Sequence, residues 1–81
     1  MKELRARLRI AWCVLRELSR QPLLSRSELT RRAILRGGSY ASFNSIFVFL
    51  VSEGYVEKNG TEMQAPYRIT DRGKRLLEGL A

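Results

Sequence analysis

Histidine is absent from the 81-residue sequence, and cysteine occurs only once, at Cys13. A zinc site built from Cys and His, a disulfide within the chain and a nucleophile paired with His are therefore excluded. The sequence also lacks a Gly-rich phosphate loop and a clustered pair of carboxylates that could act as general acid and base. We therefore expect a protein that is not an enzyme and that has no cofactor and no metal site.

Long apolar runs are missing as well. The longest, Ile10–Leu15 and Ile46–Val51, have six residues each, whereas a membrane-spanning helix needs ~20. The first residues contain no apolar stretch of signal-peptide length. We therefore expect a cytoplasmic protein without membrane contact, located in the nucleoid if it binds DNA.

Acidic residues are scarce relative to basic ones. The sequence has fifteen Lys and Arg against eight Asp and Glu, a net charge of +7. Residues 1–36 carry ten basic and three acidic side chains, whereas residues 37–57 carry two acidic and no basic ones. This uneven, Arg-rich distribution is typical of a nucleic-acid-binding protein. A general bias of the source genome toward Arg is the alternative explanation.

The length predicts a single domain over residues 1–81. A chain of this size buries only ~60% of its unfolded surface, so association with a second copy would stabilise it. We therefore expect a homodimer.

The first predicted helix runs over residues 4–20 and ends before Pro22, because a residue that precedes proline avoids helical geometry. It has a regular apolar stripe and further apolar residues outside that stripe, more than a monomer's surface helix normally carries. We expect this helix to contact both its own core and a second copy; a helix surrounded by its own domain is the alternative. The residues expected between copies lie on the first and last helices: Leu4, Leu8, Ile10, Cys13, Val14, Leu77 and Leu80. Cys13 is expected to be a small buried apolar residue, with a disulfide between two first helices as the alternative.

The second predicted helix has a clear start signal. Ser25 and Glu28 form a capping-box pattern, in which Ser25 accepts from an amide and Glu28 reaches back to the cap. The helix continues to about Leu35, and a Gly-containing turn, residues 36–39, leads into a third helix over about 40–53 that Gly54 ends.

The pattern after Gly54 changes to a period of two. Residues 55–58 and 66–69 are strand-like, and the Asn59-Gly60 pair predicts a turn between them. Thr70 or Asp71 is expected to cap a last helix, with Gly73 on its inner face. The predicted fold is α+β and mainly α: a winged helix-turn-helix with a three-helix core, a two-stranded wing and a C-terminal helix.

Two segments carry a resemblance to a known family. Residues 38–56, GSYASFNSIFVFLVSEGYV, resemble the recognition helix and first wing strand of small archaeal winged-helix regulators. Residues 67–77, YRITDRGKRLL, resemble their second wing strand and final helix. The chain is most similar to archaeal chromatin-associated winged-helix proteins, and more loosely to regulators of multidrug and phenolic-acid resistance. The resemblance covers about residues 24–80.

The resemblance implies a dimer that places two third helices in successive major grooves of double-stranded DNA, with the wings, about residues 55–69, on the backbone. The chain departs from this family in two respects. It ends at Ala81, where the chromatin-type relatives have a long C-terminal coiled coil, so pairing is expected to use the first helix, the last helix or both. Residues 39–52 contain no charged side chain, so only a modest sequence preference is expected.

The third helix is expected to have two faces. Phe43, Phe47, Leu50 and Val51 are predicted to lie in the core, with Tyr40 and Ile46 at its edges, and Val48 and Phe49 on the opposite face. Base or groove contact is expected near the start of the helix, where recognition helices reach base edges: Ser39, Tyr40, Ser42, Asn44 and Ser45. Phosphate contact is expected from the second helix and the wing: Arg26, Arg31, Arg32, Arg36, Lys58, Asn59 and Arg68.

The sequence leaves two functions open. The first is DNA binding by a transcriptional regulator or chromatin-type protein. The alternative is a winged-helix module for protein contact in transcription or replication machinery, which the uncharged third helix with Val48 and Phe49 would suit. Winged helices serve several roles, so the fold alone does not decide between them.

Overall fold

The structure is a computed structural model that describes residues 2–80, with side chains described for residues 5–80. It is an α+β fold, mainly helical, with four helices and one two-stranded antiparallel sheet over the described residues. The elements follow the predicted order: α1 (Lys2–Arg20), α2 (Arg26–Leu35), α3 (Tyr40–Ser52), β1 (Val56–Lys58), β2 (Tyr67–Ile69) and α4 (Asp71–Leu80). No helix of the described part is long and apolar enough to cross a membrane.

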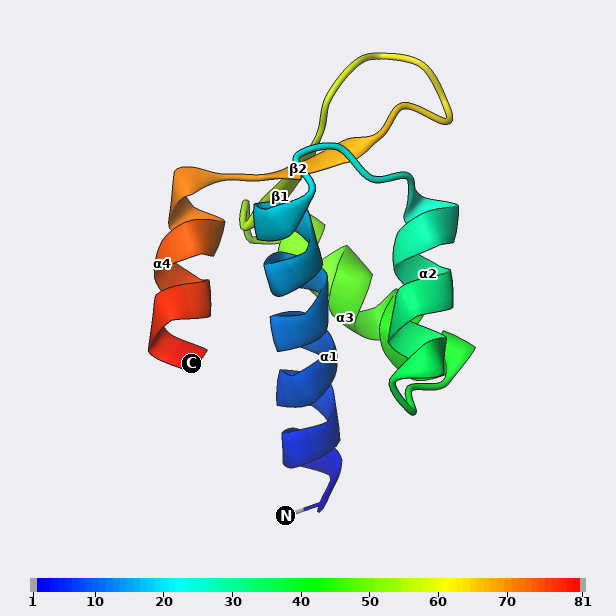
Figure 1. Cartoon of the computed structure of the whole chain (residues 1–81), viewed down its shortest axis with the longest axis vertical. Helices are drawn as coiled ribbons and strands as arrows, with labels where there is room; N and C mark the ends of the chain where they lie inside the picture. Colours follow the sequence, from blue (N-terminus) through cyan, green and yellow to red (C-terminus); the bar gives the residue numbers. More distant parts are fainter. Residues whose placement is uncertain (1, 81) are drawn as a thin grey trace.

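Helix α1 lies in the middle of the molecule. α4 packs on one side of it and α2 on the other, and α3 crosses behind it (Figure 1). Ile10, Val14 and Leu18 of α1 are all buried by the chain's own side chains. α1 therefore contacts its own core as expected, and its expected contact with a second copy stays a prediction, because Leu8 remains 44% exposed.

The core is centred on the aromatic side chains of α3. The rings of Phe43 and Phe47 stack with centroids 5.4 Å apart, and Phe47 meets the ring of Tyr67 edge-on at 4.8 Å. Two core assignments for α3 were wrong: Val51 is 39% exposed and Tyr40 is 64% exposed. Both lie on the flank of α3 next to the buried face, where a helical wheel separates core from surface by only a few tens of degrees.

Polar side chains cap three of the helices. The hydroxyl oxygens of Ser25, Ser39 and Thr70 each accept a hydrogen bond at 3.1 Å from the amide three residues further on. Only half of the predicted capping box is present, because the Glu28 carboxylate accepts from Arg31 and Arg32 instead of reaching back to the cap. Two guanidinium groups are stronger partners for a carboxylate than one backbone amide.

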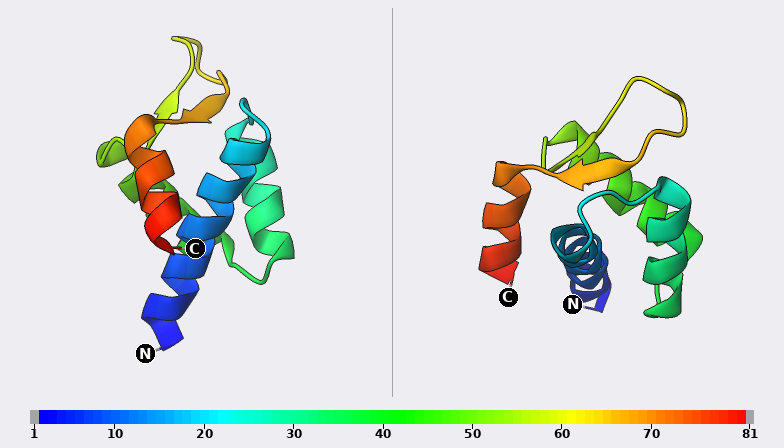
Figure 2. Two further views of the ribbon diagram at one scale, coloured as in Figure 1. Left: turned by 60° about the vertical axis from the view of Figure 1, so that its left-hand side comes forward. Right: turned by 45° about the horizontal axis from the view of Figure 1, so that its top comes forward.

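The hairpin is joined to the helices at its base. β1 and β2 pair with Val56 opposite Ile69 and Lys58 opposite Tyr67. On the other edge of β2, Leu24 and Tyr67 exchange two backbone hydrogen bonds, of 2.8 and 3.3 Å. This bridge fixes the start of α2 beside β2. Residues 59–66, the β1–β2 connection, extend away from the helices (Figure 2).

Helix α4 approaches the backbone closely at Gly73. A Cβ atom at Gly73 would lie far closer than 3.0 Å to the carbonyl oxygen of Tyr55, and 2.7 Å from Cγ1 of Ile69. The hydroxyl of Thr70, the cap of α4, donates to the carbonyl oxygen of Gly54 at 2.6 Å. The start of α4 is therefore held directly against the connection between α3 and β1, and the predicted inner position of Gly73 is confirmed.

Candidate nucleic-acid interface

A hollow of about 480 Å³ lies where the start of α2, the start of α3 and the β1–β2 connection meet. Its lining is mostly hydroxyl, amide and guanidinium groups with two tyrosine rings and one methionine, and no carboxylate lines it within the described chain. The lining residues are Ser25, Arg26, Ser27, Thr30, Tyr40, Met63, Gln64 and Tyr67. The hollow is therefore neutral to positive and suits a polar or anionic partner.

The start of α2 is placed at this hollow by two interactions. The backbone bridge to Tyr67 holds Leu24, the residue before the cap, against β2, and the Ser25 hydroxyl caps the helix. The first amides of a helix have no acceptor within the helix, and they attract anions together with the helix dipole. The amides of Arg26 and Ser27 belong to this first turn.

Arg26 links α2 to α3. Its guanidinium donates a hydrogen bond to Oδ1 of Asn44 and lies 5.2 Å from the centre of the Phe47 ring. Arg26, Tyr40 and Asn44, three of the residues predicted for DNA contact, are thus brought together at one place. Because Arg26 is exposed and its partner is a neutral amide, its positive charge is not compensated by that partner.

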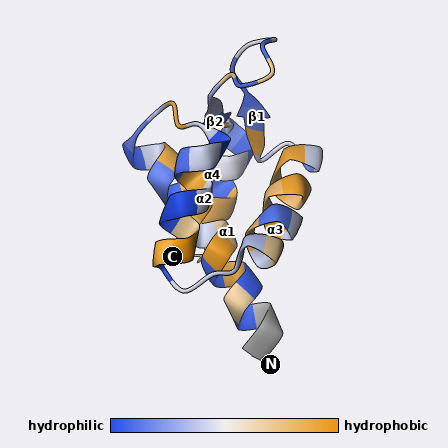
Figure 3. Cartoon of the chain, turned by 90° about the vertical axis from the view of Figure 1, so that its right-hand side faces the viewer, coloured by the Kyte–Doolittle hydropathy of each residue, from blue (hydrophilic) through white to orange (hydrophobic). Residues whose placement is uncertain are grey.

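The outward face of α3 consists of small uncharged side chains. Ala41, Ser45, Val48 and Ser52 recur along one side of the helix, and all four are exposed, Val48 by 54%. α3 is mostly orange and white in Figure 3, whereas α2 carries strong blue. The predicted exposure of Val48 and Phe49 is confirmed. Ser45 is the predicted contact residue that this outward face presents.

The two serines at the start of α3 bind each other. The Ser39 hydroxyl accepts from the amide of Ser42 at 3.1 Å and donates to the Ser42 hydroxyl oxygen at 2.9 Å. Both hydroxyls are therefore engaged in capping the helix. Ser39 is exposed and Ser42 is half-buried, so Ser39 keeps more surface for a partner.

Arg31 and Arg32, two of the residues predicted to contact phosphate, are engaged within the protein. Arg31 binds the Glu28 carboxylate at 2.5 Å, and Arg32 binds Glu28 at 3.2 Å and Glu17 of α1 at 3.1 Å. The pKa of Glu28 is lowered from its ordinary value, mainly by the hydrogen bond from Arg31 and to a smaller extent by the hydrogen bond from Arg32. Arg32 is half-buried and ties α2 to α1.

The cations of the hairpin have partners of their own. Lys58 Nζ donates to the carbonyl oxygen of Met63 at 2.8 Å, across the β1–β2 connection. Arg68 pairs with Glu57 on the neighbouring strand. Asn59 is exposed at the start of the connection, and its backbone N–H donates to the carbonyl oxygen of Pro66 at 2.7 Å. Of these residues, Lys58 forms no ion pair with a described carboxylate, and its partner Met63 lines the hollow.

Arg36 lies apart from the other predicted phosphate contacts. It belongs to the turn between α2 and α3 and lines a different hollow, together with Arg5 and Arg9 of α1. The seven predicted phosphate contacts therefore do not form one cluster. Arg26 lines the 480 Å³ hollow, and Lys58 binds the carbonyl oxygen of Met63, which also lines it.

The residues predicted between copies have unequal exposure. Ile10, Cys13 and Val14 are buried within the chain, whereas Leu8 is 44% exposed and Leu77 and Leu80 are half-buried. Leu4 lies outside the residues whose side chains the structure describes. Cys13 is 4% exposed, and burial raises its pKa. A disulfide between copies would require this side chain to leave the core.

Several lining residues were missed by the sequence reasoning. Ser27, Thr30, Met63 and Gln64 reach the hollow because the Leu24–Tyr67 bridge brings α2 next to the hairpin. An isolated bridge of one residue pair leaves no pattern in the sequence, since its bonds involve only backbone atoms. The length of the connection after Asn59 was the only available signal that its tip projects.

No group of three or more potential metal ligands occurs among the described residues. In comparison with known proteins, no family model, no curated protein and no solved structure matches this chain.

Proposed function

We propose that this chain is a winged helix-turn-helix protein that binds double-stranded DNA. In this proposal α3 enters the major groove, the β1–β2 connection acts as a wing on the flanking backbone, and Arg26 with the first amides of α2 binds a phosphate. The observation that carries the proposal is the carboxylate-free hollow at which these three elements converge. Its polar lining suits the alternation of phosphate and groove along a duplex.

The small side chains on α3 support a close approach to the groove floor. The major groove is about 12 Å wide and accepts one α-helix, and Ala41, Ser45 and Val48 add little to the helix diameter on the outward face. The Val48 methyl groups suit the methyl group of thymine, and the Ser45 hydroxyl donates to or accepts from any base edge. When a phosphate takes Arg26, the Asn44 amide is released to pair with adenine.

We further propose that two copies act together, as a transcriptional regulator or a chromatin-type protein of the nucleoid. Two α3 helices would then lie in successive major grooves, ~34 Å apart along the duplex. The low charge of α3 favours binding that depends on phosphates more than on base sequence.

The test is fluorescence anisotropy of a labelled random-sequence duplex at several salt concentrations. Affinity that falls steeply with salt is expected, and Arg26→Gln should reduce the slope of log K against log salt by ~0.9, one phosphate contact. Arg75→Gln is the matched control, because Arg75 is exposed on α4 and does not line the hollow. An equal change in both variants would count against the assignment of Arg26, and no binding at low salt would refute the proposal.

The alternative proposal, a module for protein contact, has one observation in its favour. Ile34, Leu35, Val48 and Phe49 are all exposed apolar side chains on α2 and α3, more than a phosphate-binding surface requires. Tight binding to an acidic protein, with no affinity for duplex DNA under the same conditions, would favour this function.

A further inference from the structure

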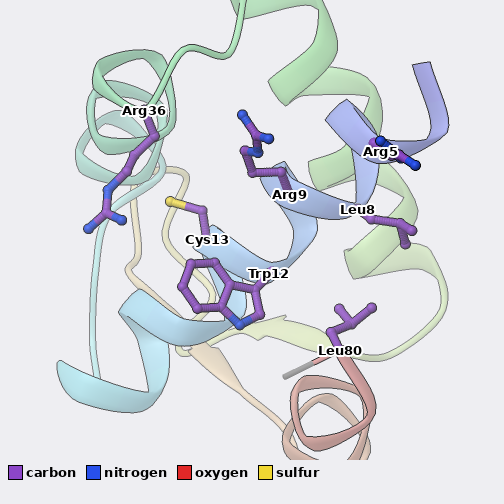
Figure 4. Close-up of a pocket in the computed structure, with 7 residues that line it drawn as sticks. All are labelled: Arg5, Leu8, Arg9, Trp12, Cys13, Arg36 and Leu80. Carbon is purple, nitrogen blue, oxygen red and sulfur yellow. The ribbon is translucent and has the colours of Figure 1, made fainter. Parts of the chain in front are cut away.

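A second and larger hollow, of about 760 Å³, lies away from the candidate nucleic-acid interface. It opens between the first half of α1, the turn that follows α2 and the end of α4 (Figure 4). The lining residues are Arg5, Leu8, Arg9, Trp12, Cys13, Arg36 and Leu80. Leu8, Cys13 and Leu80 of this lining are among the residues expected between copies, so a second copy is one candidate occupant of this surface.

The floor of the hollow is apolar. Leu8 of α1, Trp12 and Leu80 of α4 lie around the same opening in Figure 4. The apolar side chain of Leu8 is exposed to solvent, and those of Trp12 and Leu80 are only half-buried. The guanidinium of Arg16 lies 4.8 Å from the centre of the Trp12 ring, a cation–π contact that favours this position of the indole. An apolar surface around an aromatic ring held in this way is suited to a hydrocarbon group.

The charged groups of the hollow are all cations. Arg5, Arg9 and Arg36 line it, and no carboxylate lines it within the described chain. None of the three forms an ion pair with a described carboxylate. Guanidinium groups bind carboxylate and phosphate oxygens through paired N–H donors. The hollow therefore combines a hydrophobic floor with an anion-binding rim.

We propose that this hollow binds a small amphiphilic anion, a molecule with an alkyl or aryl body and a carboxylate or phosphate head. The body would lie on Leu8, Trp12 and Leu80, and the head would bind Arg9 and Arg36. The volume is within the usual range for small-molecule sites, about 300–1,000 Å³. This proposal does not depend on DNA binding, because the hollow and the candidate interface share no residue.

Charge selects this occupant over two others. A second copy placed face to face would bring the three arginines of one chain against the three of the other, which like-charge repulsion disfavours. A simple anion such as inorganic phosphate would leave the apolar floor in contact with water and would gain nothing from it. Only a ligand with both an apolar and an anionic part satisfies both parts of the lining.

The test uses Trp12, the only tryptophan of the chain, as the reporter. Its fluorescence is followed in the full chain during titration with decanoate, kept below the concentration at which it forms micelles. A saturable change is expected with decanoate, and none with decanol or decyltrimethylammonium at the same concentrations. Equal binding of decanol would show that the arginines do not recognise a charge, and would overturn the proposal.

A pair of double variants separates a specific site from the general attraction of a basic protein for anions. Arg9→Gln with Arg36→Gln removes two lining cations, and Arg7→Gln with Arg20→Gln removes two exposed cations that do not line the hollow. The first pair should weaken decanoate binding at least about tenfold, about 1.4 kcal/mol. The second should change it by no more than about twofold, as exposed charges usually do.

Two further results would overturn the proposal. Equal loss in both double variants would show that only net charge matters. A self-association that covers Trp12 and that decanoate does not displace, seen by sedimentation, would show that a second copy occupies the hollow. If the Arg9→Gln, Arg36→Gln chain does not fold, Leu8→Asp is the replacement variant, because Leu8 is 44% exposed and the added carboxylate should repel decanoate.

Discussion

Replacing Gly73 by alanine is expected to destabilise the fold, although alanine is the better helix former. In an unconstrained helix, Gly→Ala adds about 0.5–1 kcal/mol of stability. At Gly73 the added Cβ would overlap the carbonyl oxygen of Tyr55 and lie 2.7 Å from Cγ1 of Ile69. The oxygen belongs to the backbone and cannot rotate away, so α4 must move away from the connection between α3 and β1. Overpacking of this kind typically costs 1–3 kcal/mol.

The measurement is thermal or urea unfolding followed by circular dichroism. For a domain of this length each kcal/mol corresponds to roughly 4–8 °C in Tm, so Gly73→Ala should lower Tm by about 10 °C. Gly79→Ala is the matched control in the same helix, because a Cβ there meets no atom within 4 Å. It should leave Tm unchanged or raise it. A Gly73→Ala chain as stable as the Gly79→Ala chain would refute the close packing of α4 against Tyr55.

Three further changes test other parts of the structure. Ser25→Ala should cost about 1 kcal/mol of unfolding free energy, because it removes the cap of α2; an unchanged urea midpoint would contradict this. Glu28→Gln should lower Tm at neutral pH, and the difference from the parent chain should vanish in acid. The pKa of Glu28 is lowered in the fold, so the ionised carboxylate stabilises the protein above the ordinary carboxyl pKa. This stabilisation is lost as the pH falls through the folded pKa. A difference that is the same at all pH values would show that the ion pairs with Arg31 and Arg32 do not stabilise α2. Cys13 should react with iodoacetamide far more slowly in the native protein than in urea, because burial hides the thiol and raises its pKa; equal rates would show that α1 is not covered as described.

The order of helices and strands could be predicted because local signals agreed with the final packing. Ser25 and Ser39 begin helices where their side chains accept the expected amide bonds, and Gly54 ends α3 with a positive φ of 77°. These interactions involve residues only a few positions apart. Patterns of short range are the ones that a sequence displays directly.

The surroundings of α1 could not be predicted in the same way. A helix with apolar residues beyond one stripe is either buried by its own chain or shared with a partner, and periodicity does not distinguish the two. The answer depends on α4 and β2, which follow much later in the chain and pack on α1. Leu8 remains exposed after this packing, so the expected contact of α1 with a second copy stays a prediction.

The candidate interface was predicted in its composition but not in its assembly. Arg26, Tyr40 and Asn44 were each expected to contact DNA, and the structure brings them together. That Arg31 and Arg32 pair with Glu28 was not expected, although the spacing of three and four residues on one helix favours such pairs. That Tyr67 of the hairpin joins the hollow depends on the backbone bridge to Leu24, for which no side-chain pattern exists.

The central place of α1 also determines how this chain must fold during synthesis. α1 is made before α2, α3 and α4, yet Val14, Leu15 and Leu18 are covered by elements that follow later. Until α3 and α4 have emerged, the apolar face of α1 stays in contact with water, in a state that is prone to aggregate. A chain shortened before α4 would leave part of that face permanently uncovered. Folding therefore has to wait for the last helix, and truncation at the C-terminal end should harm the yield of soluble protein more than changes in the β1–β2 connection.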